Sequence, residues 1–95
     1  MPRLIFRSPL PQMPFYVYIL RCTDGSFYTG YTKNVDARAQ LHAKGKGAKY
    51  TRIHKPKSVV YVEPFATRAK AMKREREIKK LSHDEKLDLV ERAKT

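Results

Sequence analysis

Acidic residues and cysteine are both scarce in this sequence of 95 residues. Nine Asp and Glu stand against 21 Lys and Arg, which leaves a formal net charge of +12. The single cysteine, Cys22, cannot form a disulfide within the chain and cannot hold zinc alone, which excludes a disulfide-stabilised secreted domain. No apolar run approaches the roughly 18–20 residues that span a bilayer. These absences favour a soluble, cytoplasmic protein with one domain.

The apolar content is nevertheless too high for a disordered basic tail. Hydrophobic residues make up 41% of the chain and aromatic residues 11%. The positive charge therefore lies on a folded body, where such a surplus is most useful for binding a polyanion. Nucleic acid is the first partner of that kind and an anionic membrane surface the second. A membrane-surface protein is disfavoured because the chain lacks an amphipathic helix with bulky apolar residues.

Prolines are concentrated at the N-terminus, where four of the six lie within the first 14 residues. We expect residues 1–14 to form an extended, mobile arm and residues 15–92 to form the domain. Two interpretations of the arm remain open. Either Met13 is the natural start and the preceding residues are not native, or the arm uses Arg3 and Arg7 to touch nucleic acid.

Two β-rich segments at the start of the domain predict a hairpin. Residues 15–20 are β-branched or aromatic almost throughout, which is typical of a strand covered on both faces. An Asp-Gly turn separates them from a second predicted strand, residues 26–32. Side chains alternate along a strand, so Tyr18 and Tyr28 lie on one side if the register pairs their faces. Gly30 within the second strand indicates that another group approaches the backbone closely.

Five further segments complete the prediction: a helix to about Ala43, a basic loop over 44–52, a strand over 58–63, a helix over 67–81 and a short final helix. Asn34 and Thr67 are predicted to cap the first two of these helices. Ser82, followed three residues later by Glu85, forms a capping box for the last. The predicted class is α+β, with the element order β-β-α-β-α-α.

One carboxylate lies on the apolar face of the long predicted helix. With Ala71 set at 0°, Ile78 falls at about −20° and Glu75 at about 40°, whereas Glu77 at about 240° belongs to the solvated face. An ionised carboxylate that points at a core is costly unless it is paired or binds a metal. An ion pair with a nearby Arg or Lys and a metal site are therefore the two interpretations of Glu75.

Four other side chains also have both a structural and a functional interpretation. Arg38 flanks the most apolar face of its helix, where it either extends to water or offers a planar fork to a phosphate. His42 on that face is either a buried, hydrogen-bonded histidine or a catalytic one. Tyr18 and Tyr28 taken singly are core residues, but their shared face favours a site.

Basic side chains are concentrated in the loop and in the long helix. A run of charge is commonly a solvated face, but two such runs with interleaved aromatic residues and glycines indicate binding to a phosphate backbone. No common base-reading motif is present, so recognition would be of shape or backbone. The predicted nucleic-acid contacts are Lys46, Lys49, Tyr50, Arg52, Lys73 and Arg74.

Four sequence features of this chain occur in the same order in a known protein family. Tyr16-Val17-Tyr18, Tyr28-Thr29-Gly30, Arg38 and a helical Glu75 together resemble the GIY-YIG nuclease superfamily. Residues 15 to about 90 resemble its small stand-alone bacterial members. The resemblance implies a three-stranded antiparallel sheet flanked by helices. It also implies hydrolysis of phosphodiester bonds, with DNA as the favoured substrate and DNA repair or processing as the setting.

The resemblance also implies roles for single residues. Glu75 is the one protein ligand of Mg²⁺, or of Mn²⁺ in its place. Arg38 neutralises charge on the phosphate in the transition state. Either Tyr18 or Tyr28 takes the proton of the attacking water, and His42 orients or relieves that base.

The chain departs from the family pattern at three points. Tyr16 replaces a glycine, Thr29 replaces an isoleucine, and a late asparagine of many relatives is missing, because Asn34 is the only Asn. A separate DNA-binding domain is also absent, so targeting comes from this body or from a protein partner. The alternative function is a non-catalytic nucleic-acid-binding module with the same fold. Convergence of the two tyrosines with Arg38 and Glu75 would favour the enzyme.

Overall fold

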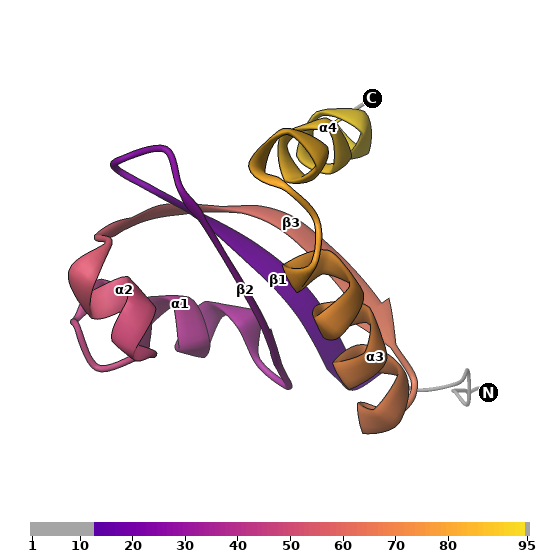
Figure 1. Ribbon diagram of the computed structural model, residues 1–95. Coiled ribbons are helices and arrows are strands. Elements are labelled where there is room, and N and C mark those ends of the chain that lie inside the picture. Colours follow the sequence, from indigo (N-terminus) through magenta and orange to yellow (C-terminus); the bar gives the residue numbers. More distant parts are fainter. Residues whose placement is uncertain (1–12, 95) are drawn as a thin grey trace, which may run out of the picture.

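A three-stranded antiparallel sheet forms the centre of the molecule (Figure 1). Its strands are β1 (Phe15–Cys22), β2 (Phe27–Thr32) and β3 (Pro56–Phe65), with β1 in the middle. The computed structural model describes residues 13–94. Residues 1–12 of the predicted arm therefore lie outside the described residues.

The helices are α1 (Val35–Ala43), α2 (Lys49–Ile53), α3 (Arg68–Lys79) and α4 (His83–Ala93). The α+β class and the antiparallel sheet flanked by helices are confirmed. The predicted order was wrong in one element, because α2 occupies part of the expected loop and makes the order β-β-α-α-β-α-α. The glycines of that region all precede α2, and the five residues Lys-Tyr-Thr-Arg-Ile contain neither glycine nor proline to prevent a helical turn.

The third strand is longer than the predicted segment 58–63. It includes Pro56 and Pro64, two residues that normally indicate the end of a strand. β3 lies at an edge of the sheet, where a missing N–H can face away from the ladder. The first strand likewise continues beyond residue 20 to Cys22, and α3 ends at Lys79 rather than near residue 81.

The predicted helix caps are confirmed. The side chain of Asn34 accepts from the backbone N–H of Ala37, and that of Thr67 accepts from the N–H of the residue three positions later. Ser82 and Glu85 form both hydrogen bonds of the capping box at the start of α4. These caps depend on neighbouring residues only, which is why the sequence predicts them well.

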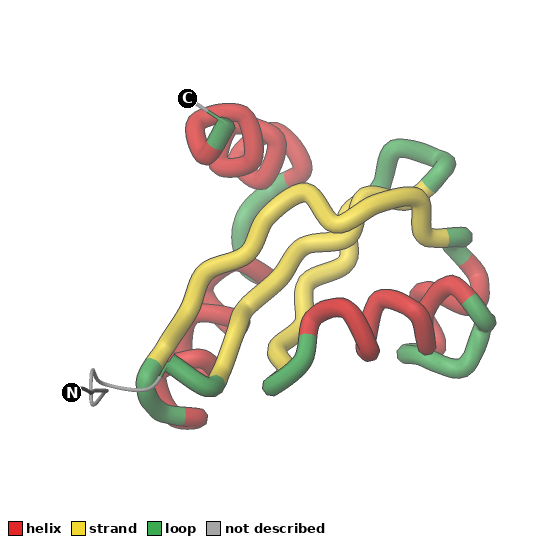
Figure 2. Tube along the Cα trace, turned by 180° about the vertical axis from the view of Figure 1, so that it is seen from behind, coloured by secondary structure: helices red, strands yellow, loops and turns green. Residues whose placement is uncertain are grey.

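The middle strand β1 is covered on both faces, as predicted. Val17 and Ile19 are fully buried in a core cluster that includes Ile78 of α3 and Val90 of α4. Tyr18 points to the opposite face, where it contacts α1. Figure 2 shows α3 behind the strands and α1 nearer to the viewer. The sheet therefore separates an apolar core from a polar, aromatic cluster.

One buried hydroxyl has no hydrogen-bond partner among residues 13–94. It belongs to Thr29 of β2, which is 2% exposed. Removing an unsatisfied buried hydroxyl saves its desolvation cost.

We therefore expect Thr29→Val to raise the free energy of unfolding by about 1 kcal/mol in chemical denaturation. Thr51→Val is the matched control, because the equally buried hydroxyl of Thr51 is hydrogen-bonded and its loss should lower stability by about 1–3 kcal/mol. A loss of stability in Thr29→Val would contradict this account.

Candidate active site

A chain of hydrogen bonds joins the middle strand to α1 and α2. The hydroxyl of Tyr18, at the centre of β1, lies 2.9 Å from Nε2 of His42 on α1. Nδ1 of His42 lies 2.6 Å from Oγ1 of Thr51 on α2. Thr51 in turn donates to the carbonyl of Ala48, at 2.9 Å. Tyr18, His42 and Thr51 are each at most 2% exposed, so water does not compete for these bonds.

The direction of each bond in this chain follows from counting protons. Thr51 has one hydroxyl proton and gives it to Ala48, so its oxygen must accept from Nδ1–H of His42. The other nitrogen, Nε2, then carries the lone pair and accepts from the hydroxyl of Tyr18. Burial, and secondly the positive charge of Arg38, lower the pKa of His42. His42 is therefore neutral, with its basic nitrogen aimed at Tyr18.

The second tyrosine of the motif lies beside this chain. The ring of Tyr28 lies 5.0 Å from that of His42 and 6.3 Å from that of Tyr18, measured between centroids. The register pairs Tyr18 with Gly30 and Leu20 with Tyr28, so the two tyrosines share a face, as predicted. Tyr28 is half-buried, whereas Tyr18 is 1% exposed. Tyr28 is thus the phenol that solvent reaches more easily.

Gly30 allows the two rings to lie over the second strand. A Cβ added at Gly30 would lie 2.7 Å from the hydroxyl oxygen of Tyr18 and 3.1 Å from Cε2 of Tyr28. The close approach expected at this glycine is therefore confirmed. Gly47, between α1 and α2, likewise leaves room for a ring, because a Cβ there would overlap the imidazole of His42.

Two charged side chains act on the tyrosines with opposite signs. Burial is the largest influence and raises the pKa of both Tyr18 and Tyr28. The negative charge of Glu75 raises both pKa values further, and the positive charge of Arg38 lowers both. Arg38 and Glu75 therefore both lie close enough to act on the two phenols. Arg38 also acts on His42.

The side chain of Glu75 is largely buried but not sealed. It is 16% exposed, and its ion pair is with the exposed Lys79, whose Nζ lies 3.6 Å from Oε2. Among residues 13–94, no group of three or more His, Cys, Asp or Glu side chains could enclose a metal ion. Mg²⁺ commonly uses one or two carboxylates and takes its other ligands from water and substrate phosphate. Glu75 fits that arrangement and does not fit a metal held by protein alone.

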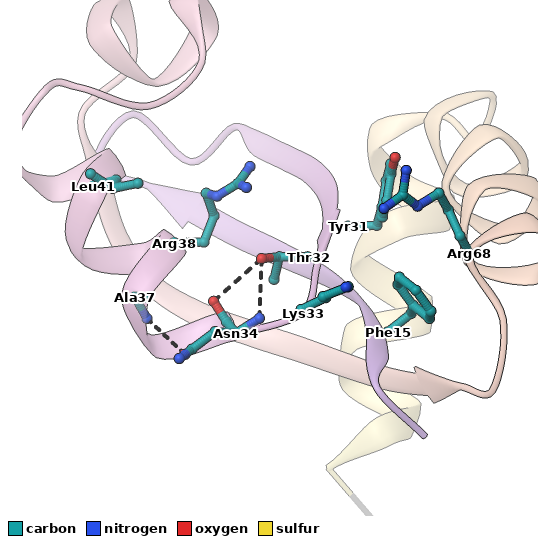
Figure 3. Close-up of a pocket in the computed structure, with 9 residues that line it drawn as sticks. All are labelled: Phe15, Tyr31, Thr32, Lys33, Asn34, Ala37, Arg38, Leu41 and Arg68. Carbon is teal, nitrogen blue, oxygen red and sulfur yellow. Dashed lines mark hydrogen bonds between the residues drawn. The ribbon is translucent and has the colours of Figure 1, made fainter. Parts of the chain in front are cut away.

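An open groove of about 620 Å³ adjoins the cluster and shares Arg38 with it. Figure 3 shows Arg38 and Leu41 on one side, Phe15, Tyr31 and Arg68 on the other, and Thr32 and Lys33 between them. The backbone N–H of Asn34 donates to Thr32 at 3.2 Å, which holds the start of α1 beside the end of β2. Within the described residues 13–94, no carboxylate lines the groove.

The predicted nucleic-acid contacts are distributed over two regions. Lys46, Lys49 and Arg52 are exposed on and before α2, and Lys73 is exposed on α3. Tyr50 stacks on His54 with 4.2 Å between centroids and lies 5.9 Å from Tyr28, so it continues the aromatic cluster. These positions leave the predicted contacts open to a ligand.

Arg74 differs from the other predicted contacts because carboxylates already surround it. Its Nε donates to Glu63 of β3 at 3.0 Å, and its Nη1 donates to Glu77 at 3.4 Å. Tyr61 donates to the same carboxylate of Glu63, at 2.7 Å. The structure thus gives Arg74 a place in a network that links α3 to β3.

Sequence patterns did not single out Thr51, Gly47 or the groove residues Phe15, Lys33 and Arg68. Thr51 had a detectable signal, since a threonine one turn after an extended residue can hydrogen-bond its carbonyl. The groove had none, because its walls come from distant parts of the chain.

Comparisons with known proteins show the family of this chain. The GIY-YIG catalytic domain matches residues 14–88. A UPF0213 protein of Staphylococcus haemolyticus is 53% identical over 76 residues, which is 80% of this chain and 93% of that protein. A UPF0213 protein of Staphylococcus epidermidis is 50% identical over the same shares of the two chains.

Two solved structures resemble the fold. The solution NMR structure of a UPF0213 protein from Bacillus halodurans is 52% identical, covers 81% of this chain and 82% of its own, and has a TM-score of 0.53. A protein from E. faecalis, also solved by NMR, is 42% identical over 78% of this chain and 80% of its own, again with a TM-score of 0.53. Among residues 13–94, none of the helices has the length and apolar character needed to cross a membrane.

The hydrogen-bond chain predicts which nitrogen of His42 carries the proton. We expect ¹⁵N NMR of the imidazole to show the Nδ1–H tautomer in the wild type at neutral pH. Thr51→Ser keeps the acceptor oxygen and should keep this tautomer, whereas Thr51→Val removes it and should raise the Nε2–H population. An Nε2–H tautomer in the wild type, or no change in Thr51→Val, would show that Thr51 does not orient the ring.

Proposed function

Since the chain belongs to the GIY-YIG nuclease family, we propose that it is a metal-dependent endonuclease that hydrolyses phosphodiester bonds, with DNA as the favoured substrate. The observation that carries this proposal is that the charges of Arg38 and Glu75 both act on Tyr18 and Tyr28, while Tyr18 is hydrogen-bonded to the buried His42. A domain that only bound nucleic acid would gain nothing from a largely buried carboxylate whose charge acts on the same phenols as Arg38. DNA repair or processing is the proposed setting.

The proposed path of the proton avoids a free phenolate. A phenol is a poor base near neutral pH, and burial raises the pKa of both tyrosines, so neither ring ionises by itself. In this proposal Tyr28, the more exposed phenol, accepts the proton of the attacking water and passes its own to the oxygen of Tyr18. Tyr18 passes its proton to Nε2 of His42, and each phenol ends with one proton. His42 keeps Nδ1–H on Thr51 throughout.

Arg38 and Glu75 supply the charges that the reaction needs. The guanidinium of Arg38 binds the scissile phosphate and stabilises the negative charge that builds on its oxygens in the transition state. Glu75 would hold Mg²⁺ or Mn²⁺, which, when bound, neutralises phosphate charge and polarises the phosphoryl group. Burial, and secondly the same positive charge of Arg38, lower the pKa of His42, so the imidazole is neutral before the reaction and its Nε2 lone pair is free.

Binding of the substrate rests on exposed basic side chains and one aromatic ring. Lys46, Lys49, Arg52 and Lys73 contact phosphates of the substrate, and Tyr50 offers an aromatic face beside Tyr28. No common base-reading motif is present in the sequence, so targeting would come from recognition of shape or backbone by this domain, or from a protein partner.

A non-catalytic binding module is the second candidate function. The low pKa of the buried His42 favours it, because a weak base accepts a proton less readily. The exposed lysines and arginines would serve either function, so binding alone does not distinguish the two.

The carboxylate of Glu75 is the sharpest test of an enzyme. We expect Glu75→Gln to reduce cleavage of labelled DNA with Mg²⁺ or Mn²⁺ by about 100-fold or more, because transition-state charge stabilisation is lost. Binding should survive. Glu77→Gln is the matched control, since Glu77 lies on the same helix, is more exposed and pairs with Arg74. It should cut as the wild type does.

The substrates for this test are single-stranded, duplex and branched DNA, with RNA beside them. Metal-dependent cutting that persists in Glu75→Gln would refute the role of Glu75. A wild type that binds these substrates and cuts none of them would establish the non-catalytic module instead.

Arg38 should affect catalysis and the titration of His42 together. We expect Arg38→Gln to reduce kcat by about 10²–10³, the effect of removing one transition-state donor. Because the charge of Arg38 lowers the pKa of His42, the same variant should raise that pKa in an NMR titration. Arg52→Gln is the control, with weaker binding but an unchanged pKa of His42. An unchanged kcat in Arg38→Gln would contradict the assignment.

A further inference from the structure

We propose that the groove between α1 and α3 binds the phosphate backbone of one nucleic-acid strand next to the cleaved bond, with Lys33 and Arg68 as the phosphate contacts. The inference rests on the proposed function, because it extends the substrate beyond Arg38. Lys33 and Arg68 were not among the contacts expected from the sequence.

The first support is charge without compensation. Of the part of the chain that the structure describes, three cationic side chains, Lys33, Arg38 and Arg68, line the groove, and no Asp or Glu does. Elsewhere among residues 13–94, ion pairs with carboxylates are formed by Arg74, Lys79, Arg92 and Lys94. Within the same described residues, none of the three groove cations forms an ion pair with a carboxylate. The three cations therefore create a positive electrostatic potential in the groove, which attracts a phosphate chain.

The second support is that one ring holds two of these cations in place. Nζ of Lys33 lies 5.4 Å from the centroid of Phe15, and Cζ of Arg68 lies 5.8 Å from the same centroid. Each contact is a favourable cation–π interaction, but the two like charges repel each other. An anion between them removes that repulsion. Phe15 thus presents a preformed pair of cations to a phosphate.

The third support is continuity with the proposed active site. Arg38 belongs both to the groove and to the cluster around Tyr18 and Tyr28. A strand whose scissile phosphate lies on Arg38 can continue past Lys33 toward Arg68, across the floor that Thr32 contributes (Figure 3). The hollow, at about 620 Å³, has the size of a small-ligand site and admits a short stretch of one strand rather than a duplex.

The test measures binding without cleavage. The full chain is titrated, in the presence of EDTA, into a fluorescein-labelled single-stranded oligothymidylate, and fluorescence anisotropy is followed over a range of KCl concentrations. Each phosphate contact on a single strand contributes about 0.7 to the slope of log K against log salt. We expect Lys33→Gln and Arg68→Gln each to flatten the slope by about 0.7, and to weaken binding about fivefold at ~0.1 M salt. Both side chains are exposed, so neither change should unfold the protein.

The chain offers a matched control in Arg21→Gln. Arg21 lies over the ring of Phe27 at 5.7 Å, which is the same kind of contact, but it does not line the groove. This variant changes the net charge equally and should leave the slope near that of the wild type. Equal flattening by all three variants would overturn the groove as a specific track. So would wild-type slopes in both groove variants.

The two levels of the proposal fail differently in this experiment. A wild type with no salt-dependent binding would refute nucleic-acid binding itself, and with it the proposed nuclease. A wild type that binds normally, with groove variants no weaker than Arg21→Gln, would refute only the groove.

Discussion

The hydrogen bond between Tyr18 and His42 is the contact on which the geometry of the site depends. It joins the middle strand of the sheet to α1, and the bond from His42 to Thr51 extends the link to α2. All three side chains are buried, so breaking one bond would leave polar groups without partners in a low-dielectric setting. The two hydrogen bonds therefore keep the loop with Gly47 against the imidazole, and they fix one tautomer of His42.

The large positive charge of the chain assists this arrangement. Arg38 lowers the pKa of His42 in addition to the effect of burial, so the imidazole stays a neutral acceptor inside a protein with 21 basic residues. The same charge favours ionised phenols, whereas burial and Glu75 oppose them. Opposed influences of this kind are typical of sites where a proton has to move.

Features that depend on local sequence were predictable, and features that depend on distant contacts were not. The caps at Asn34, Thr67 and Ser82 follow from neighbouring residues, and strand periodicity predicted the shared face of the tyrosines. Helical periodicity placed Glu75 near the core, and its side chain is 16% exposed. By contrast, the groove contact of Phe15 with Arg68 joins the first strand to α3, and no local pattern reports it. The bond of Arg74 to Glu63 was likewise not predictable from local sequence, since Glu63 lies on another element.

The position of Glu75 separates the two candidate functions on physical grounds. A carboxylate that acts on the same phenols as Arg38 repels any phosphate that Arg38 attracts. In a protein that only bound nucleic acid, that repulsion would lower affinity, and a neutral residue would serve better. The cost is removed if a divalent cation lies between the carboxylate and the phosphate. A carboxylate at this position is therefore better suited to a metal-dependent nuclease than to a protein that only binds nucleic acid, although its ion pair with Lys79 is available to either.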